Sequence, residues 1–171
     1  GIEGQTEYAA ESTLPWMHPG RTAAVKINGE TVGYLGEVHP AVAKNYEIGT
    51  KVYLAVLQMR PLIAHAKLVT VYQPLPKFPA ITRDIAMLVK ETVTVKQIAD
   101  VIRKNGGDYL EEVKLFDVYQ GAQIEAGYKS VAYSISFRSA ERTLADTDIA
   151  DAMQAILDGL AKELGAQLRD K

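Results

Sequence analysis

Cysteine is absent from the 171 residues, no long apolar run occurs, and basic residues do not exceed acidic ones. Without cysteine there is no disulfide framework, no thiolate metal site and no thiol nucleophile. No apolar stretch approaches the roughly 20 residues that a bilayer-spanning helix needs. The net charge of −2 and a pI near 6.0 mean that any contact with RNA must come from a local surface rather than from the overall field.

The remaining composition is that of an ordinary soluble protein, with 47% hydrophobic and 23% charged residues. A chain of this length buries one sizeable core or two small ones. The first residues, Gly-Ile-Glu-Gly-Gln, have neither the basic flank nor the apolar centre of a signal peptide. We therefore expect a cytoplasmic protein with no membrane segment, and the missing initiator methionine suggests a fragment of a longer chain.

A proline-rich stretch divides the sequence. Residues 67–79 contain three prolines, which exclude both a helix and a central strand, so residues 67–77 are predicted to be an extended linker. Upstream, two strand-like runs over 22–27 and 31–38 meet at Asn28-Gly29, a pair that favours a tight hairpin turn. Helical turns over 40–45 and 60–66 and a strand over 51–58 follow. This first region, residues 1–66, has little helix to cover its sheet, so we expect it to pack against something that the sequence lacks.

The order of elements downstream predicts a fold. An apolar run over 85–89 precedes a capping box, Thr94 with Gln97, that starts a helix ending near Gly106. Strands over 113–119 and 129–138, a helix from Asp146 to Gly165 and a short final strand over 166–169 complete it. This βαββαβ order is the ferredoxin-like arrangement, an α+β fold with four antiparallel strands and both helices on one face. The strand over 129–138 alternates apolar with small or polar side chains, so one face of the sheet is expected to be open.

Five phrases of the sequence resemble one family. They are His-Pro-Gly-Arg at 18–21, Gly-Glu-Val-His-Pro at 36–40, Lys-Phe-Pro-Ala-Ile-Thr-Arg-Asp-Ile-Ala at 77–86, Leu-Phe-Asp-Val-Tyr-x-Gly at 115–121 and Arg-Thr-Leu at 142–144. In this order they resemble the carboxy-terminal part of the bacterial phenylalanyl-tRNA synthetase beta subunit.

The resemblance implies a function without local chemistry. Residues 78–171 would form the ferredoxin-fold anticodon-binding domain, and residues 1–66 would close a catalytically silent copy of the synthetase core. The implied partners are phenylalanine tRNA, through its anticodon stem-loop, the rest of the beta subunit and the alpha subunit in an (αβ)₂ assembly. ATP and magnesium would act in the alpha subunit of the parent enzyme, and no catalytic residue, metal or cofactor is expected in this chain.

The candidate RNA-binding residues lie at strand ends and in one loop. Tyr119 is predicted to stack on a base, whereas Phe116 would lie on the other face of a regular strand, in the core. Arginines and small polar residues would hold the RNA backbone and meet base edges, with Asp84 orienting Arg83. The complete set comprises Lys77, Arg83, Asp84, Tyr119, Arg138, Ser139, Arg142 and Thr143. If Arg142 contacts a base edge, Arg142→Ala would weaken tRNA binding by about 1–3 kcal/mol.

Other functions find less support in the residues. An acylphosphatase-like hydrolase needs a phosphate-binding loop after the first strand, but residues 90–93 there include an acid and no glycine. A small-molecule regulatory or protein-interaction domain remains an alternative, because such pockets need no sharp motif. His18 and His39 match no zinc spacing and are expected to form turns before proline. Asp146, Asp148 and Asp151 are expected to stabilise a helix start rather than bind a cation.

Overall fold

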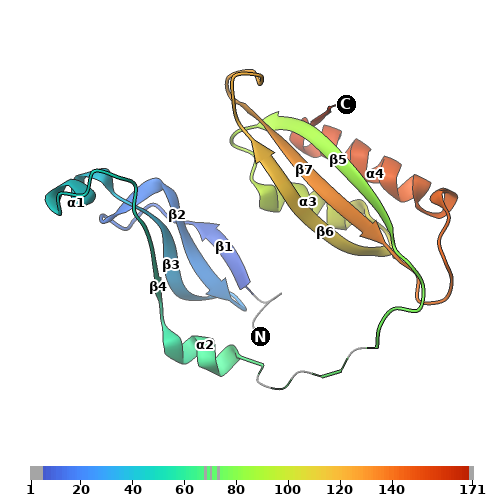
Figure 1. Ribbon diagram of the computed structural model, residues 1–171, viewed down its shortest axis with the longest axis horizontal. Helices are drawn as coiled ribbons and strands as arrows, with labels where there is room; N and C mark the ends of the chain where they lie inside the picture. The colour runs from blue at the N-terminus through green and yellow to red at the C-terminus, as the bar shows by residue number, and fades with distance from the viewer. Residues whose placement is uncertain (1–5, 68, 70, 73, 170–171) are drawn as a thin grey trace. The chain divides into compact units, whose positions relative to one another are not determined.

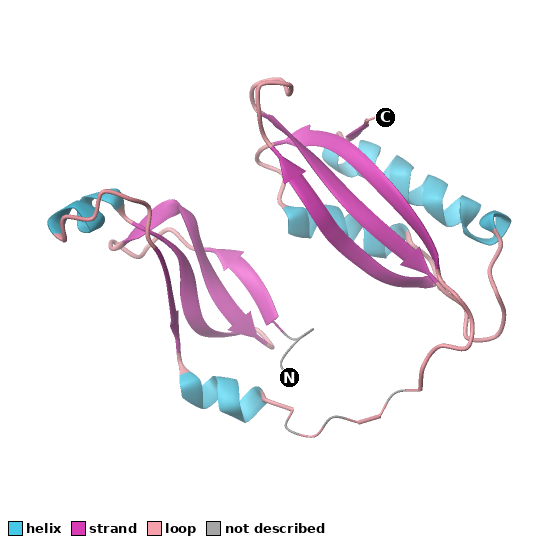
Figure 2. Ribbon diagram, viewed as in Figure 1, coloured by secondary structure: helices cyan, strands magenta, loops and turns pink. Residues whose placement is uncertain are grey.

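The computed structural model describes residues 6–67, 69, 71–72 and 74–169. The chain divides into two compact units, Gly1–Gln73 and Pro74–Lys171. Each unit contains one antiparallel sheet, shown with its helices in Figures 1 and 2. Among the described residues no helix is long and apolar enough to cross a membrane.

The first unit is a four-stranded antiparallel sheet in the order β1-β2-β3-β4, with two short helices. The predicted hairpin is confirmed: β2 and β3 meet at Asn28 and Gly29, whose φ angles of 50° and 83° allow the tight turn. Strand β1 was not predicted. The elements are β1 (Thr6–Ala10), β2 (Met17–Ile27), β3 (Glu30–Val38), α1 (Pro40–Asn45), β4 (Tyr53–Leu57) and α2 (Met59–His65).

The described residues of this unit form a small core. It consists of Val25, Ile27 and Val32, with Leu35 and Leu62 packed against them. All of β4 is exposed, and so are several other large apolar side chains, among them Trp16, Tyr46, Met59 and Ile63. Large exposed apolar areas are uncommon on isolated domains. The exposure agrees with the expectation of a missing partner, and that partner stays a prediction.

The second unit has the predicted ferredoxin-like topology. Its sheet order is β6-β7-β5-β8, every pairing is antiparallel, and both helices lie behind the sheet in the view of Figure 1. The first and third strands of the unit therefore occupy the centre. The elements are β5 (Ile81–Lys90), α3 (Val95–Asn105), β6 (Leu110–Tyr119), β7 (Tyr128–Phe137), α4 (Asp146–Leu164) and β8 (Gln167–Leu168).

The helix ends follow from local chemistry. At the start of α3 the Thr94 hydroxyl accepts a hydrogen bond from the Gln97 amide at 3.2 Å, and the Gln97 side chain accepts from the Thr94 amide at 2.8 Å. This reciprocal capping box satisfies two amides that the helix cannot. Helix α4 ends at Gly165, whose φ of 62° is left-handed and suits glycine. The predicted capping box and both helix ends near glycine are confirmed.

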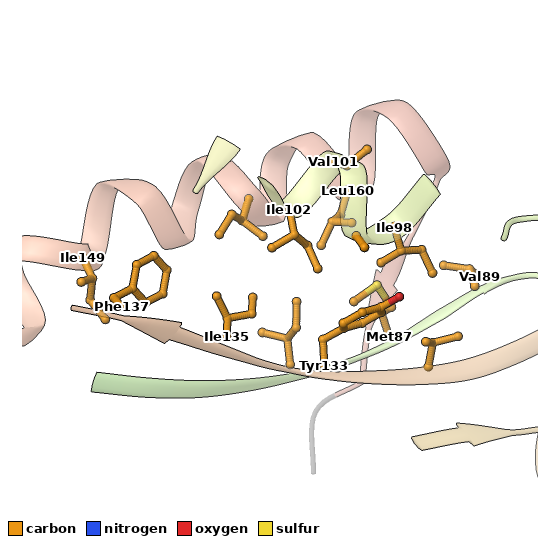
Figure 3. Close-up of a cluster of buried hydrophobic side chains, with 14 of the residues drawn as sticks. Met87, Val89, Ile98, Val101, Ile102, Tyr133, Ile135, Phe137, Ile149 and Leu160 are labelled. Atoms are coloured by element: carbon orange, nitrogen blue, oxygen red, sulfur yellow. The ribbon is translucent and has the colours of Figure 1, made fainter. Parts of the chain in front are cut away.

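The core lies between the sheet and the two helices (Figure 3). The predicted alternation of β7 is confirmed, because Val131, Tyr133, Ile135 and Phe137 are at most 2% exposed on the face toward the helices. The buried Tyr133 hydroxyl donates to the Val95 carbonyl at 2.7 Å, which ties the centre of the sheet to the first turn of α3. A complete core on one face leaves the other face of the sheet available for contacts.

Candidate nucleic-acid interface

The face of the sheet turned away from the helices, called the open face here, carries four rows of side chains across β5, β7 and β6. At one end the rows are polar, and at the other they contain alanine, serine, leucine and tyrosine together with one aspartate. In order they are Thr82, Ser136 and Glu112; Asp84, Ser134 and Lys114; Ala86, Ala132 and Asp117; and Leu88, Ser130 and Tyr119.

A β-bulge decides which side chains of β6 reach this face. Leu115 pairs with Tyr133 on the helix side, but the register then shifts, so that Asp117 pairs with Ala132. One extra residue, Phe116, interrupts the alternation at this point. Beyond the bulge Tyr119 lies on the open face, and Phe116 is 54% exposed. The prediction that Phe116 belongs to the core is therefore wrong, and so is the assumption of a regular strand that allowed only one available ring.

The Tyr119 ring lies against the loop that follows β6. A Cβ atom on Gly121 would be only 2.3 Å from the Tyr119 hydroxyl oxygen and 2.6 Å from Cζ. Glycine at this position lets the ring approach the loop backbone closely. With 41% of Tyr119 exposed, one part of the ring contacts the loop while another remains accessible.

Arg83 and Asp84 do not act together. They are successive residues of a regular strand, so their side chains lie on opposite faces. The Arg83 guanidinium donates to the Asp146 carboxylate at 2.5 Å, at the start of α4, and to the Thr82 carbonyl at 3.0 Å. The prediction that Asp84 orients Arg83 is wrong, while Asp84 itself is exposed on the open face.

Arg142 is held by a carboxylate of α4. Two of its nitrogens donate to the two oxygens of Asp148, at 2.7 and 2.6 Å, and Asp148 also accepts from the Ala145 amide at 2.7 Å. Hydrogen bonding to Arg142, with the Ala145 amide second, lowers the pKa of Asp148 to about 2, and the same pair raises the pKa of Arg142. An RNA contact by Arg142 would have to share or open this pair. Of the carboxylates expected to stabilise the start of α4, Asp146 and Asp148 lie in its first turn, and Asp148 caps it through the Ala145 amide.

Arg138 and Ser139 lie at the end of β7 with other internal partners. Arg138 donates to the Glu111 carboxylate at 2.8 Å and to the Phe78 carbonyl. Ser139 is buried, and its hydroxyl accepts from the Glu141 amide at 3.1 Å. Lys77, Arg138 and Ser139 all line an open cleft of about 460 Å³, and Lys77 is exposed. The exposed Thr143 does not line this cleft.

The predicted residues occupy two distant places. Tyr119 pairs with Ser130 at the start of β7, whereas Arg138 follows Phe137 at its end. Eight residues of strand at about 3.4 Å each separate Ser130 from Arg138 by roughly 27 Å. In Figure 1 the β6–β7 loop lies at the upper end of the sheet and the β7–α4 loop at the lower right end. The structure therefore does not gather the predicted set into one compact site.

Sequence reasoning missed three residues beside Tyr119. Ser130 faces it across the strand pair, Asp117 lies in the adjacent row, and Arg169 donates to the Ser130 hydroxyl at 3.3 Å. The phrase at 115–121 contains Asp117 and marked this region, although Asp117 itself was not selected. Nothing local in the sequence marks Ser130 or Arg169, because only strand pairing brings them to Tyr119.

The histidines that precede proline make local hydrogen bonds. The Nδ1 atom of His18 accepts from the Gly20 amide at 3.1 Å, and that of His39 accepts from the Ala41 amide at 3.2 Å. His39 is the N-cap of α1, whereas His18 lies within β2, so the prediction of a turn is wrong for His18-Pro19. Within the described ranges no group of three metal-ligating side chains is found.

Comparisons with known proteins match both parts of the chain. A family model described as ferredoxin-fold anticodon binding domain matches residues 76–169, and one described as phenylalanyl tRNA synthetase beta chain CLM domain matches residues 1–59. The phenylalanine–tRNA ligase beta subunit of Clostridium tetani is 48% identical over 165 residues, which cover 96% of this chain and 21% of that protein. The beta subunit of Lactiplantibacillus plantarum is 43% identical over 168 residues, covering 98% and 21%. The chain thus spans about a fifth of the length of these relatives.

Proposed function

Since the chain belongs to the family of phenylalanyl-tRNA synthetase beta subunits and carries their ferredoxin-fold anticodon-binding domain, we propose that its second unit binds the anticodon stem-loop of phenylalanine tRNA. The proposed contact is the Tyr119 end of the open face. One observation supports this choice above the others: the bulge in β6 exposes two aromatic rings, Phe116 and Tyr119, beside the sheet face that is turned away from α3 and α4.

The chemistry of this end suits unpaired bases. Single-stranded RNA is recognised mainly by stacking of splayed bases on aromatic rings and by hydrogen bonds to base edges. Tyr119 offers a ring face, and the exposed Asp117 carboxylate accepts hydrogen bonds from base N–H groups. Ser130 is 7% exposed, and its hydroxyl accepts from Arg169 beneath them. Ring and polar groups within adjacent rows give stacking and edge contacts to the same nucleotide.

The arginine end is a second, separate proposed contact. Lys77, Arg138, Ser139, Arg142 and Thr143 lie too far from Tyr119 to contact the same base. An RNA hairpin that reaches both ends would place its stem or a flanking strand here. Because Arg138 and Arg142 are already paired with carboxylates, their contribution would be smaller than that of unpaired cations. Arg83 and Asp84 would touch RNA only by different faces of the sheet.

We propose that the full protein acts in attaching phenylalanine to its tRNA, and that this part contributes tRNA binding without performing chemistry. The relatives are named as beta subunits of a ligase, which implies a complementary alpha subunit. In this proposal the ATP-dependent reaction, with its magnesium, takes place in the alpha subunit of an (αβ)₂ enzyme in the cytoplasm. Linkage to further tRNA contacts in the whole enzyme would raise the affinity above that of this chain alone.

A fluorescence-anisotropy titration tests the proposal. The chain would be titrated against a labelled phenylalanine anticodon stem-loop and against the same hairpin with a scrambled anticodon. We expect the wild-type chain to bind the phenylalanine hairpin more tightly than the scrambled one. Tyr119→Ala should bind the phenylalanine hairpin more weakly, whereas Arg103→Gln, on the helix side, should bind it as the wild type does. Equal binding of both hairpins that disappears at high salt would reduce the interaction to non-specific phosphate contact. Stabilisation by a free amino acid with no response to RNA would favour a regulatory domain instead.

A further inference from the structure

The last described residue, Arg169, is brought to the Tyr119 end of the open face by β8. The Arg169 amide donates to the Ala86 carbonyl at 2.9 Å, which extends the pairing of β8 with β5 by one residue. From there the side chain crosses β5, and its Nη1 donates to the Ser130 hydroxyl of β7 at 3.3 Å. The guanidinium therefore lies over the row of side chains that includes Tyr119.

Its electrostatic situation differs from that of the other arginines of this unit. Arg83, Arg103, Arg138 and Arg142 each have a carboxylate oxygen within 3.8 Å. Arg169, by contrast, contacts no carboxylate among the described residues, and its one side-chain partner is a neutral hydroxyl. A guanidinium has five N–H donors, and the described residues use one of them, so the other four can serve a ligand.

The available ligand chemistry follows from the neighbours. Ser130 is the cross-strand partner of Tyr119, and paired residues of adjacent strands lie about 5 Å apart. A cation that touches Ser130 is thus within the span of one nucleotide from the Tyr119 ring. A base stacked on that ring carries its phosphate on the same short backbone, and guanidinium forks bind phosphate oxygens well.

We propose that Arg169 binds a backbone phosphate of the nucleotide whose base stacks on Tyr119. This inference rests on the proposed RNA-binding function. It adds positive charge to the open face, where the charge of Lys114 is outweighed by those of Asp84, Glu112 and Asp117. The Ser130 hydroxyl holds the guanidinium in place before RNA arrives. Arg169 and Tyr119 together then fix both ends of one nucleotide.

The test measures the salt dependence of binding to the phenylalanine anticodon stem-loop. Loss of one phosphate contact lowers the slope of log Kd against log salt by about 0.7 for single-stranded RNA. If the variant and the wild type bind equally near about 1 M salt, this difference in slope makes the variant bind about fivefold more weakly than the wild type at about 0.1 M. Arg169→Gln should show both effects, since glutamine keeps a donor for Ser130 and removes the charge. Arg169→Lys should restore the slope.

The controls separate this inference from the function on which it rests. Arg103→Gln removes the same charge from the helix side and should leave the slope unchanged. If Tyr119→Ala weakens binding while Arg169→Gln leaves both affinity and slope as in the wild type, Arg169 is not a phosphate ligand and only this inference fails. If Tyr119→Ala also leaves binding unchanged, the whole site is misplaced. A slope that Arg169→Lys does not restore would mean that the charge is not what matters.

Discussion

Replacing Gly121 with alanine should move the Tyr119 ring without disturbing the fold. The new Cβ atom would stand 2.3 Å from the tyrosine hydroxyl oxygen, well inside any tolerated contact, so the ring must rotate away. Gly121 is not in the left-handed backbone region, hence alanine adds no backbone strain. Tyr119 is 41% exposed, so its ring has room to turn. Base stacking on an aromatic ring contributes about 1–3 kcal/mol, so we expect RNA binding about 5- to 150-fold weaker.

The assay is the same anisotropy titration, run as a double-mutant cycle. Gly121→Ala should weaken binding in the wild-type background and have little further effect when Tyr119 is already alanine, because the two changes act through one ring. Gly49→Ala is the matched control, since its Cβ would meet nothing within 4 Å and its backbone is likewise not left-handed. Wild-type affinity for Gly121→Ala, or an equal loss in the Tyr119→Ala background, would refute the reasoning.

Three further predictions concern stability. Tyr133→Phe removes the buried hydrogen bond to the Val95 carbonyl and should lower the free energy of unfolding in urea by about 1 kcal/mol. Burial raises the pKa of Tyr133 to about 12, so the stability that its neutral phenol provides should be lost as pH rises from 10 toward 12, and the variant should not show this loss. Bonding to Arg142 lowers the pKa of Asp148 from 3.8 to about 2, so the contribution of Asp148 to folding stability is complete above pH 3.8 and lost as pH falls toward 2. In thermal melts, Asp148→Asn should therefore have a lower melting temperature than the wild type at neutral pH, and its melting temperature should fall less in acid. Gly33→Ala puts a Cβ 2.2 Å from a β4 carbonyl oxygen, so β4 must shift at a cost of about 1–3 kcal/mol, and hydrogen exchange of its amides should quicken.

The topology of the second unit could be predicted because its signals are local. Thr94 and Gln97 mark the start of a helix, Gly165 marks the end of another, and the strict alternation of residues 129–138 indicates a strand with one covered face. Each signal depends only on residues a few positions apart. In the first unit the Asn28-Gly29 turn was recognisable for the same reason, whereas β1 contains no turn or strong alternation and is defined mainly by pairing with β2.

The site was harder to predict because its residues are selected by register. Tyr119 was chosen correctly as an exposed ring, but Phe116 was assigned to the core because an extra residue in a strand leaves no mark in the sequence. Arginines were chosen for their charge, yet carboxylates that bind Arg83 and Arg142 come from α4, up to 63 residues away. Arg169 was overlooked since its relation to Ser130 exists only once β8 joins the sheet.

The bulge at Phe116 also means that the end of β6 can lose a residue without exchanging its faces. Because side chains alternate with a period of two, Tyr119 would face the helices and Val118 the open face if the strand paired regularly through Phe116. Deleting Phe116 would instead remove the bulge and keep Asp117 opposite Ala132 and Tyr119 opposite Ser130. A one-residue deletion would thus remove one exposed ring and leave the other on its face, an effect that no single substitution in the strand would reproduce.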